Sequence, residues 1–287
     1  MGLHNHAILL IHCTDRKGLI STITHFLYEH NGNIVDLDEH VEKDEGIFFM
    51  RVEWDLEGFD IPRDQIQTAF AEKIANHYEM QWQLYFTDKK PKMAIFVSKA
   101  SHCLYDILSR YYSGEWQIEI PLIISNHTIH QEVADRYDIP FHYFEVTKDN
   151  KAESEKQQLA LLSEYQIDFI ILARYMQVLS DDFISHYPNK IINIHHSFLP
   201  AFAGARPYHR AHERGVKLIG ATSHYVTADL DAGPILEQDV AKISHKDSVD
   251  DLIRKGKDLE KIVLSRAIWL HLQRKALVHN NRTVIFD

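Results

Sequence analysis

Two polar residues at the end of an apolar run have the right types and spacing to act on a carbonyl group. The run is Ile191-Ile192-Asn193-Ile194-His195, and alternation along a strand puts Asn193 and His195 on the same side. An asparagine amide can donate a hydrogen bond to an oxyanion, and a histidine can carry a proton near neutral pH. The pattern predicts a catalytic pair at a strand end, although a capping asparagine beside a half-buried histidine fits the same residues.

Such a pair needs a sheet whose strands end at a common edge. From Met93 onward, short apolar runs alternate with amphipathic stretches. The predicted strands are 93–98, 120–125, 141–144, 168–173, 191–194, 218–226 and 234–240, and the predicted helices are 101–112, 128–137, 152–165 and 247–272. This order is typical of an α/β fold with a doubly wound, mostly parallel sheet, which binds ligands beyond the carboxyl ends of its strands.

The N-terminal part of the chain follows a different pattern. Strands are predicted at 7–13, 33–42, 46–54 and 80–86, with one helix beginning at Leu19 and another running from Pro62 to His77. This is the βαββαβ order of a ferredoxin-like unit. The polar segment 87–91 ends in proline and interrupts the pattern. We therefore predict two domains, 1–87 and 92–287, with a small hairpin at 276–286 ending the second.

Composition and charge limit the possible partners, cofactors and location. The chain of 287 residues has a net charge of −10, which argues against a nucleic-acid partner. No apolar run approaches the roughly 20 residues that span a bilayer, and we expect a soluble, cytoplasmic protein without membrane contact. The 20 histidines are scattered, without an HExxH motif or a His/Cys cluster, so we predict no metal site. No GxGxxG or P-loop motif is present, so we expect no nucleotide cofactor.

A longer pattern surrounds the pair and resembles a known family. It comprises Asn193-Ile194-His195, Leu199-Pro200, Gly204, Gly220-Ala221-Thr222-Ser223-His224-Tyr225-Val226 and Leu230-Asp231-Ala232-Gly233-Pro234-Ile235. In this order the residues resemble the folate-dependent formyltransferase family, with glycinamide ribonucleotide and methionyl-tRNA transformylases as members.

The resemblance implies a role for each matched position. Asn193, His195 and Asp231 match the catalytic residues of the family. The substrate pocket would be formed by the segment 173–180 on one wall and by the segment that begins at Val226 on the other. The residues implied to bind the folate are Met176, Gln177, Leu179, His224, Val226, Ala228 and Asp229.

The N-terminal unit carries a second resemblance. Asp15-Arg16-Lys17-Gly18-Leu19-Ile20 resembles the ligand loop of ACT domains. The resemblance implies that Asp15, Gly18, Leu19 and Ile20 bind a regulatory amino acid. Because ACT sheets often pair side by side, it also implies a homo-oligomer.

An ACT domain joined to a formyltransferase-like domain resembles the formyltetrahydrofolate deformylase family. The turn at 98–104 has no glycine, whereas the transformylases hold a phosphate with a glycine-rich turn, and His196 stands where they usually have proline. The resemblance implies metal-free, cofactor-free hydrolysis of 10-formyltetrahydrofolate to formate and tetrahydrofolate, which feeds one-carbon and purine metabolism.

Three alternatives remain at this point. The protein could transfer the formyl group to a small amine, or bind a folate or an amino acid without turnover, or act as a metal hydrolase through its many histidines.

Overall fold

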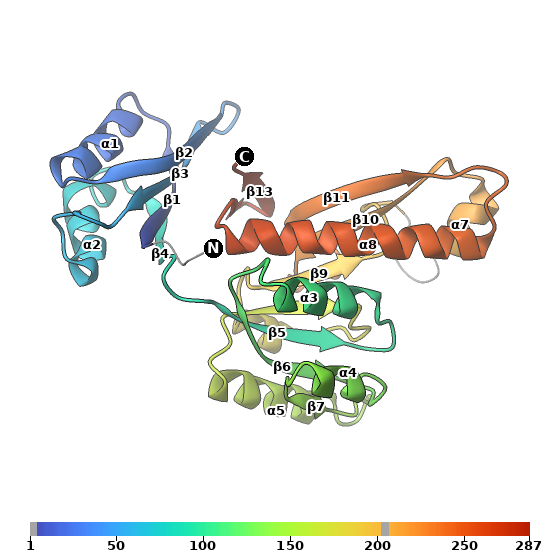
Figure 1. The fold of residues 1–287 in the computed structure, drawn as a ribbon. Coiled ribbons are helices and arrows are strands. Elements are labelled where there is room, and N and C mark those ends of the chain that lie inside the picture. Colours follow the sequence, from blue (N-terminus) through green and yellow to red (C-terminus); the bar gives the residue numbers. More distant parts are fainter. Residues whose placement is uncertain (1–4, 202–206) are drawn as a thin grey trace. The chain divides into compact units, whose positions relative to one another are not determined.

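The chain forms two compact units (Figure 1). The structure, a computed structural model, describes residues 5–201 and 207–287, so Gly204 of the family pattern lies outside the described residues. The first unit comprises Met1–Lys90 together with Arg274–Leu277 and Val284–Asp287, and the second comprises Pro91–Gln273 with Val278–Thr283. None of the helices in the described ranges is both long and apolar enough to cross a membrane.

The first unit has the predicted βαββαβ order. Its elements are β1 (His6–Thr14), α1 (Leu19–Glu29), β2 (Asn33–Glu42), β3 (Ile47–Asp55), α2 (Arg63–Phe70) followed by a π-helical turn (Ala71–Ala75), and β4 (Gln81–Phe86). The antiparallel sheet has the order β2-β3-β1-β4. This confirms the ferredoxin-like topology.

Alternation along β1 divides the apolar residues between the two faces of this sheet. Leu9 and Ile11 point into a core formed with both helices, where Phe26 of α1 and Phe70 of α2 meet edge to face. Leu10 points to the opposite face.

The opposite face explains a difference from the predicted domains. Leu10 packs there with Phe49, Leu277 and Phe286. The last two belong to the predicted hairpin, formed by β12 (Ala276–His279) and β13 (Arg282–Ile285). Because the two ends of this hairpin bury apolar side chains on the first sheet, they belong to the first unit, whereas the sequence pattern predicts that the whole of 92–287 belongs to the second domain.

The second unit is a three-layer α/β structure. Its elements are β5 (Lys92–Val97), α3 (His102–Tyr112), β6 (Glu119–Ser125), α4 (Gln131–Arg136), β7 (Phe141–Tyr143), α5 (Lys151–Glu164), β8 (Phe169–Ala173), α6 (Asp181–Ser185), β9 (Ile191–His195), α7 (Pro207–Arg214), β10 (Leu218–Tyr225), β11 (Ile235–Lys242) and α8 (Val249–Leu272). The strand order is β11-β10-β9-β8-β5-β6-β7. Strands β5 to β9 pair in parallel, and β10 is antiparallel to both of its neighbours. The predicted doubly wound, mostly parallel sheet is confirmed.

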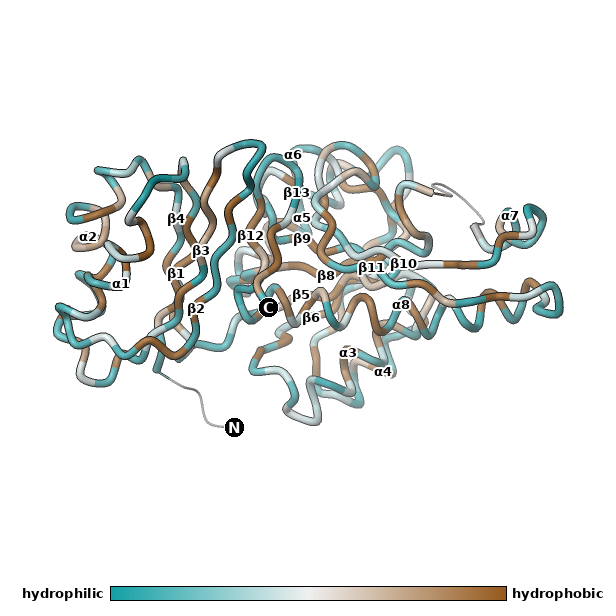
Figure 2. The backbone as a smooth tube through the Cα atoms, turned by 90° about the horizontal axis from the view of Figure 1, so that it is seen from above, coloured by the Kyte–Doolittle hydropathy of each residue, from teal (hydrophilic) through white to brown (hydrophobic). Residues whose placement is uncertain are grey.

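The strand order places the functional edge of the sheet. The chain winds outward from β5 through β6 to β7 and then returns to the other side of β5 with β8 and β9. The central strands are apolar along their length, as Figure 2 shows for β5, β6 and β8, and they are buried on both faces. Ligands of such sheets bind at the carboxyl ends of the strands where the winding reverses, which here are the ends of β5, β8 and β9.

Helix α8 packs along β9, β10 and β11 and approaches α7 closely at Gly256 (Figure 1). A capping box of Ser248 and Asp251 begins the helix. A Cβ atom at Gly256 would lie 2.1 Å from the hydroxyl oxygen of Tyr208, which hydrogen-bonds Glu260 at 2.6 Å. Only glycine therefore permits this close approach.

Replacing Gly256 with alanine should destabilise the second unit. The methyl group would push the buried Tyr208 ring away from Glu260, and overpacking of this kind costs about 1–3 kcal/mol, more than the gain of up to about 1 kcal/mol in helix propensity. Urea unfolding of Gly256→Ala measures this loss. The exposed Lys257→Ala on the same helix should stay within about 0.5 kcal/mol of wild type, and an unchanged midpoint for Gly256→Ala would contradict the expected clash.

Candidate active site

Asn193 and His195 both line a cavity of about 360 Å³ at the carboxyl ends of β8 and β9. They lie two residues apart in β9, so the pleat of the strand turns them to the same side. The neighbouring strand β10 runs antiparallel to β9 and sets His224 opposite Asn193. The turn after β10 brings Asp231 to the same cavity. The structure thus brings together the three residues that were predicted to be catalytic.

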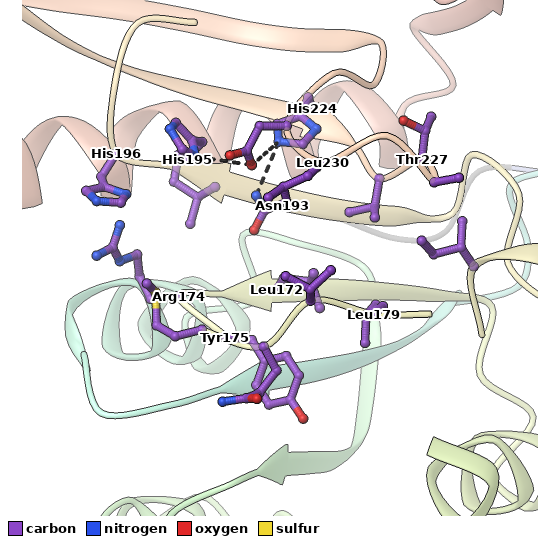
Figure 3. A pocket seen from close by; sticks show the side chains of 18 residues that line it. Leu172, Arg174, Tyr175, Leu179, Asn193, His195, His196, His224, Thr227 and Leu230 are labelled. Carbon is purple, nitrogen blue, oxygen red and sulfur yellow. Dashed lines mark hydrogen bonds and ion pairs between the residues drawn. The ribbon is translucent and has the colours of Figure 1, made fainter. Parts of the chain in front are cut away.

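Asp231 faces His195 as an ionised carboxylate. Its Oδ1 atom lies 3.2 Å from Nδ1 of His195 (Figure 3). The hydrogen bond from His195 lowers the pKa of Asp231 and outweighs the opposing effect of burial. Asp231 has a left-handed backbone conformation with φ of 56°, which aspartate adopts more readily than most residues. The turn therefore presents an anion to the histidine.

His224 determines the direction in which the Asn193 amide points. Nδ1 of His224 lies 2.9 Å from the carbonyl oxygen of Tyr225, which can only accept, so Nδ1 carries the proton. Burial lowers the pKa of His224, so the ring is neutral and its Nε2 is an acceptor. Nδ2 of Asn193 lies 3.2 Å from this Nε2 and donates to it. One N–H of the amide is thereby fixed on His224, and the second remains to serve a ligand.

His195 has one ring nitrogen held and one without a partner. Its Nδ1 donates to Asp231, because a carboxylate can only accept. Its Nε2 is buried and has no hydrogen-bond partner among the described residues. A buried polar atom without a partner costs free energy, so this nitrogen is a candidate contact for a bound substrate.

The wall opposite β9 is the loop that follows β8. Its course is set by Ser98 at the end of β5, whose hydroxyl accepts from the backbone N–H of Met176 at 3.0 Å and donates to Asn126 at 2.6 Å. Met176 and Val178 are 61% and 55% exposed, and Leu230 across the cavity is 67% exposed. Exposed apolar side chains around a concave site suit a flat ring system.

All but one of the residues predicted to bind substrate line the cavity. Those in its wall are Met176, Gln177, Leu179, His224, Val226 and Ala228. The exception is Asp229, which is exposed and whose carbonyl oxygen accepts from the N–H of Ala232 and the hydroxyl of Thr227. Asp229 therefore shapes the turn but does not line the cavity.

Other lining residues were not predicted. Leu172, the last residue but one of β8, has its side chain on the cavity side, which the alternation of a strand could have indicated, and Leu230 precedes the predicted Asp231. Ile184 comes from α6, whose five residues are too few for a helical period to be visible in the sequence.

A second group of titratable residues lies behind this site. Glu260 of α8 is buried and accepts from Nε2 of His102 at 2.7 Å and from the hydroxyl of Tyr208. Burial alone would raise the pKa of Glu260, but the His102 hydrogen bond and the charge of Arg174 together hold it below its ordinary value. The group is therefore centred on a carboxylate.

The same group contains a possible set of metal ligands. Ligand atoms of His102, Cys103 and Glu260 lie within 4.8 Å of one another. However, both carboxylate oxygens already accept hydrogen bonds, and Nε of the Arg174 cation lies 3.5 Å from one of them. Burial also raises the pKa of Cys103 well above its ordinary value, which keeps it a neutral thiol and a poor ligand. The arrangement favours a hydrogen-bonded network over a metal site.

The predicted regulatory loop of the first unit is partly exposed. Gly18 has φ of 91°, which permits the tight entry into α1, and Asp15 and Ile20 are exposed beside it. Leu19 is buried in the core under the sheet, so its side chain is not available to a ligand. The structure therefore brings Asp15, Gly18 and Ile20 to one accessible loop but assigns Leu19 to packing.

An asparagine donor and a histidine paired with an ionised aspartate, set at the strand ends of a doubly wound sheet, define an enzyme that adds a nucleophile to a carbonyl carbon. Comparison with protein families identifies the lineage. The formyl transferase model matches residues 91–268, and the ACT domain model matches residues 7–72. The chain belongs to the formyl transferase family and carries an ACT domain at its N-terminal end.

Several relatives are similar over nearly the whole chain. The chain is 54% identical over 280 residues to a formyltetrahydrofolate deformylase from Synechocystis sp., covering 98% of both chains. It is 48% identical to one from Bacillus subtilis, covering all of this chain and 95% of the relative. The crystal structure of a formyltetrahydrofolate deformylase from Pseudomonas syringae pv. tomato is 42% identical and superposes with a TM-score of 0.96, covering 99% of this chain and 95% of that one.

Proposed function

We propose that this protein hydrolyses 10-formyltetrahydrofolate to formate and tetrahydrofolate. The observation that carries the proposal is the pairing of His195 with the ionised Asp231 beside the oriented amide of Asn193. The relatives are similar over the ACT domain as well as the catalytic unit, and they are named deformylases. These names support water as the acceptor of the formyl group. The apolar cavity beside these residues suits the pterin ring of a folate.

In the proposed mechanism, water adds to the formyl carbon on N10. The contacts of Asp231 among the described residues involve its Oδ1, so Oδ2 remains to orient the water and to accept its proton. As the tetrahedral intermediate forms, the free N–H of Asn193 donates to the developing oxyanion. His195, charged beside Asp231, stabilises the same oxygen and then gives its proton to N10 as the C–N bond breaks.

The reaction balances without a cofactor or a metal. A C–O bond forms, the bond from carbon to N10 breaks, and the carbon keeps its oxidation state. One water is consumed per turnover, and formate, tetrahydrofolate and one proton are released. Asp231, His195 and Asn193 supply the proton transfers and hydrogen bonds, so the proposal needs no further group.

The test is incubation with 10-formyltetrahydrofolate alone, with formate and tetrahydrofolate measured over time. We expect equal amounts of both products without any amine, and the same rate with excess chelator. Formyl transfer that requires an added small amine would support the runner-up function instead. Loss of activity on chelation would support the metal hydrolase, and binding without any turnover would leave a non-catalytic folate-binding protein.

We also propose that a small amino acid binds the first unit at the loop formed by Asp15, Gly18 and Ile20. The ACT family match supports a small-molecule effector there. Asp15 is exposed and anionic, which suits the amino group of such a ligand. Isothermal calorimetry with single amino acids should show heat for at least one, and the heat should disappear in Asp15→Ala. A wild-type protein that gives no heat with any amino acid would contradict this proposal.

We further propose that the protein is a homo-oligomer that acts in the cytoplasm, where its products feed one-carbon and purine metabolism. In the part of the chain that the structure describes, β2 and β4 each pair on one side only, so both edges of the first sheet are open to another strand. Sedimentation velocity should give a mass that is a multiple of the chain mass of 33.5 kDa. A mass equal to one chain at micromolar concentration would contradict the oligomer.

A further inference from the structure

Arg174 has a backbone conformation that its residue type disfavours. It follows β8 directly and has φ of 62°, in the left-handed region. A bulky residue with a β-carbon is strained there. Such strained conformations persist only where the surrounding structure enforces them, and they are most frequent at functional sites. The conformation turns the chain at the edge of the active-site cavity, which Arg174 lines together with Asn193 and His195.

The guanidinium group is anchored but not satisfied. Its Nε atom lies 3.5 Å from Oε2 of Glu260, within ion-pair range, yet this nitrogen is buried and makes no hydrogen bond among the described residues. Each carboxylate oxygen of Glu260 already accepts one hydrogen bond, from His102 at 2.7 Å and from Tyr208 at 2.6 Å. A guanidinium has five N–H donors, so within the described part of the chain most of the donors of Arg174 remain for another acceptor.

Arg174 provides the fixed positive charge at this end of the cavity. Figure 3 shows its guanidinium beside His196, next to His195. Burial, followed by the charge of Arg174, lowers the pKa of His196 to about 4, so His196 is neutral at physiological pH. The side chain of Arg174 is 15% exposed, and charge-assisted hydrogen bonds are stronger when water is largely excluded.

We propose that Arg174, anchored by Glu260, forms a binding subsite for a small carboxylate, namely the formate that the reaction produces. This inference rests on the proposed function. The formyl group of the substrate is neutral, whereas formate carries one negative charge, so Arg174 acts on the product and on the charge that develops toward it. Because the reacting carbon must lie within reach of His195, the carboxylate forms in the cavity that Arg174 also lines.

The subsite can be tested by direct binding, apart from turnover. Formate labelled with ¹³C is titrated with the full-length protein, with and without tetrahydrofolate, and its dissociation constant is obtained from line broadening. We expect Arg174→Gln to weaken formate binding about tenfold or more, because a charge-assisted hydrogen bond pair is lost. Arg174→Lys should keep part of the affinity. Arg136→Gln, an exposed arginine of α4 in the same unit, should bind as wild type does.

Several outcomes would overturn the formate subsite. Equal formate affinity in wild type and Arg174→Gln, or no formate binding to the wild type in either condition, overturns the subsite. Weaker binding of tetrahydrofolate with unchanged formate binding overturns it too and assigns Arg174 to the glutamate tail of the folate. If Arg174→Gln does not fold, as judged by its thermal unfolding, Arg174→Lys serves, and formate affinity equal to that of the wild type then overturns the subsite. A wild type that binds formate through Arg174 but releases none from 10-formyltetrahydrofolate refutes the proposed function and leaves the subsite standing.

Discussion

Asp231→Asn is expected to lower kcat for formate release by about 10²–10⁴-fold, the range of a lost general acid–base group. The amide oxygen of asparagine can still accept the hydrogen bond from Nδ1 of His195, which lies 3.2 Å from the carboxylate. It cannot take a proton from water or balance the charge of a protonated His195. Asparagine tolerates the φ of 56° at this position, so the turn should keep its course. The measurement is kcat and KM with 10-formyltetrahydrofolate.

The matched control is Asp135→Asn, the same change at an exposed position of α4, and we expect wild-type kinetics from it. An Asp231→Asn protein that released formate at the wild-type rate would show that this carboxylate takes no part in the chemistry. A raised KM with unchanged kcat would give it a role in binding alone.

The same variant should change the pH dependence of stability. The pKa of Asp231 in the folded protein is lowered below its unfolded-state pKa of about 3.9. The ionised carboxylate therefore stabilises the fold at pH values above about 3.9, and this contribution is lost as the pH falls through the folded-state pKa. The melting temperature of Asp231→Asn should therefore lie below that of the wild type at neutral pH. The difference should shrink below about pH 3.9.

His195→Ala is the second change from which we expect a large loss, again about 10²–10⁴-fold in kcat. The ring joins Asp231 on one side to a buried Nε2 that has no partner among the described residues, so it is the group placed to carry a proton to the substrate. Its removal also leaves Asp231 without the hydrogen bond that lowers its pKa.

Imidazole rescue distinguishes a proton carrier from a packing residue. His195 is 7% exposed, so its removal leaves a space of about the size of the missing ring at the cavity wall. Free imidazole should restore part of the activity of His195→Ala, with a rate that rises with imidazole concentration, and should not accelerate the wild type. Wild-type kcat in His195→Ala would contradict the assignment, and a loss that imidazole cannot repair would favour a structural role.

The strands that build the site were predictable because they are short apolar runs buried on both faces. The predicted strand 191–194 lies within one residue of β9, and the alternation that placed Asn193 and His195 on one side holds in the structure. The least predictable elements are those with the fewest residues. Helix α6 makes about one turn, and the π-helical turn after α2 continues the predicted helix with hydrogen bonds that span one residue more than those of an α-helix.

Contacts between distant segments lay beyond the sequence. The sequence pattern predicts a hairpin that includes Leu277 and Phe286. Only the tertiary structure shows that these two side chains pack on Leu10 and Phe49, so that they belong to the first unit. Leu19 matched a ligand loop, but burial under the sheet removes its side chain from any ligand. Periodicity shows that a residue is apolar and on which side it points, but not which surface covers it.

Asn193, His195 and Asp231 were predicted from the sequence, and the tertiary structure adds their mutual geometry. The chemistry of these residues, the sheet that carries them and their family could be predicted from the sequence, since residue type and local period are properties of short segments. The orientation of the Asn193 amide by His224 and the pairing of Asp231 with His195 became visible only in the folded chain. The same holds for Glu260, which hydrogen-bonds His102, 158 residues away in the chain, and pairs with Arg174 at the cavity. Hydrogen bonds between remote segments depend on packing in three dimensions and leave no periodic trace along the chain.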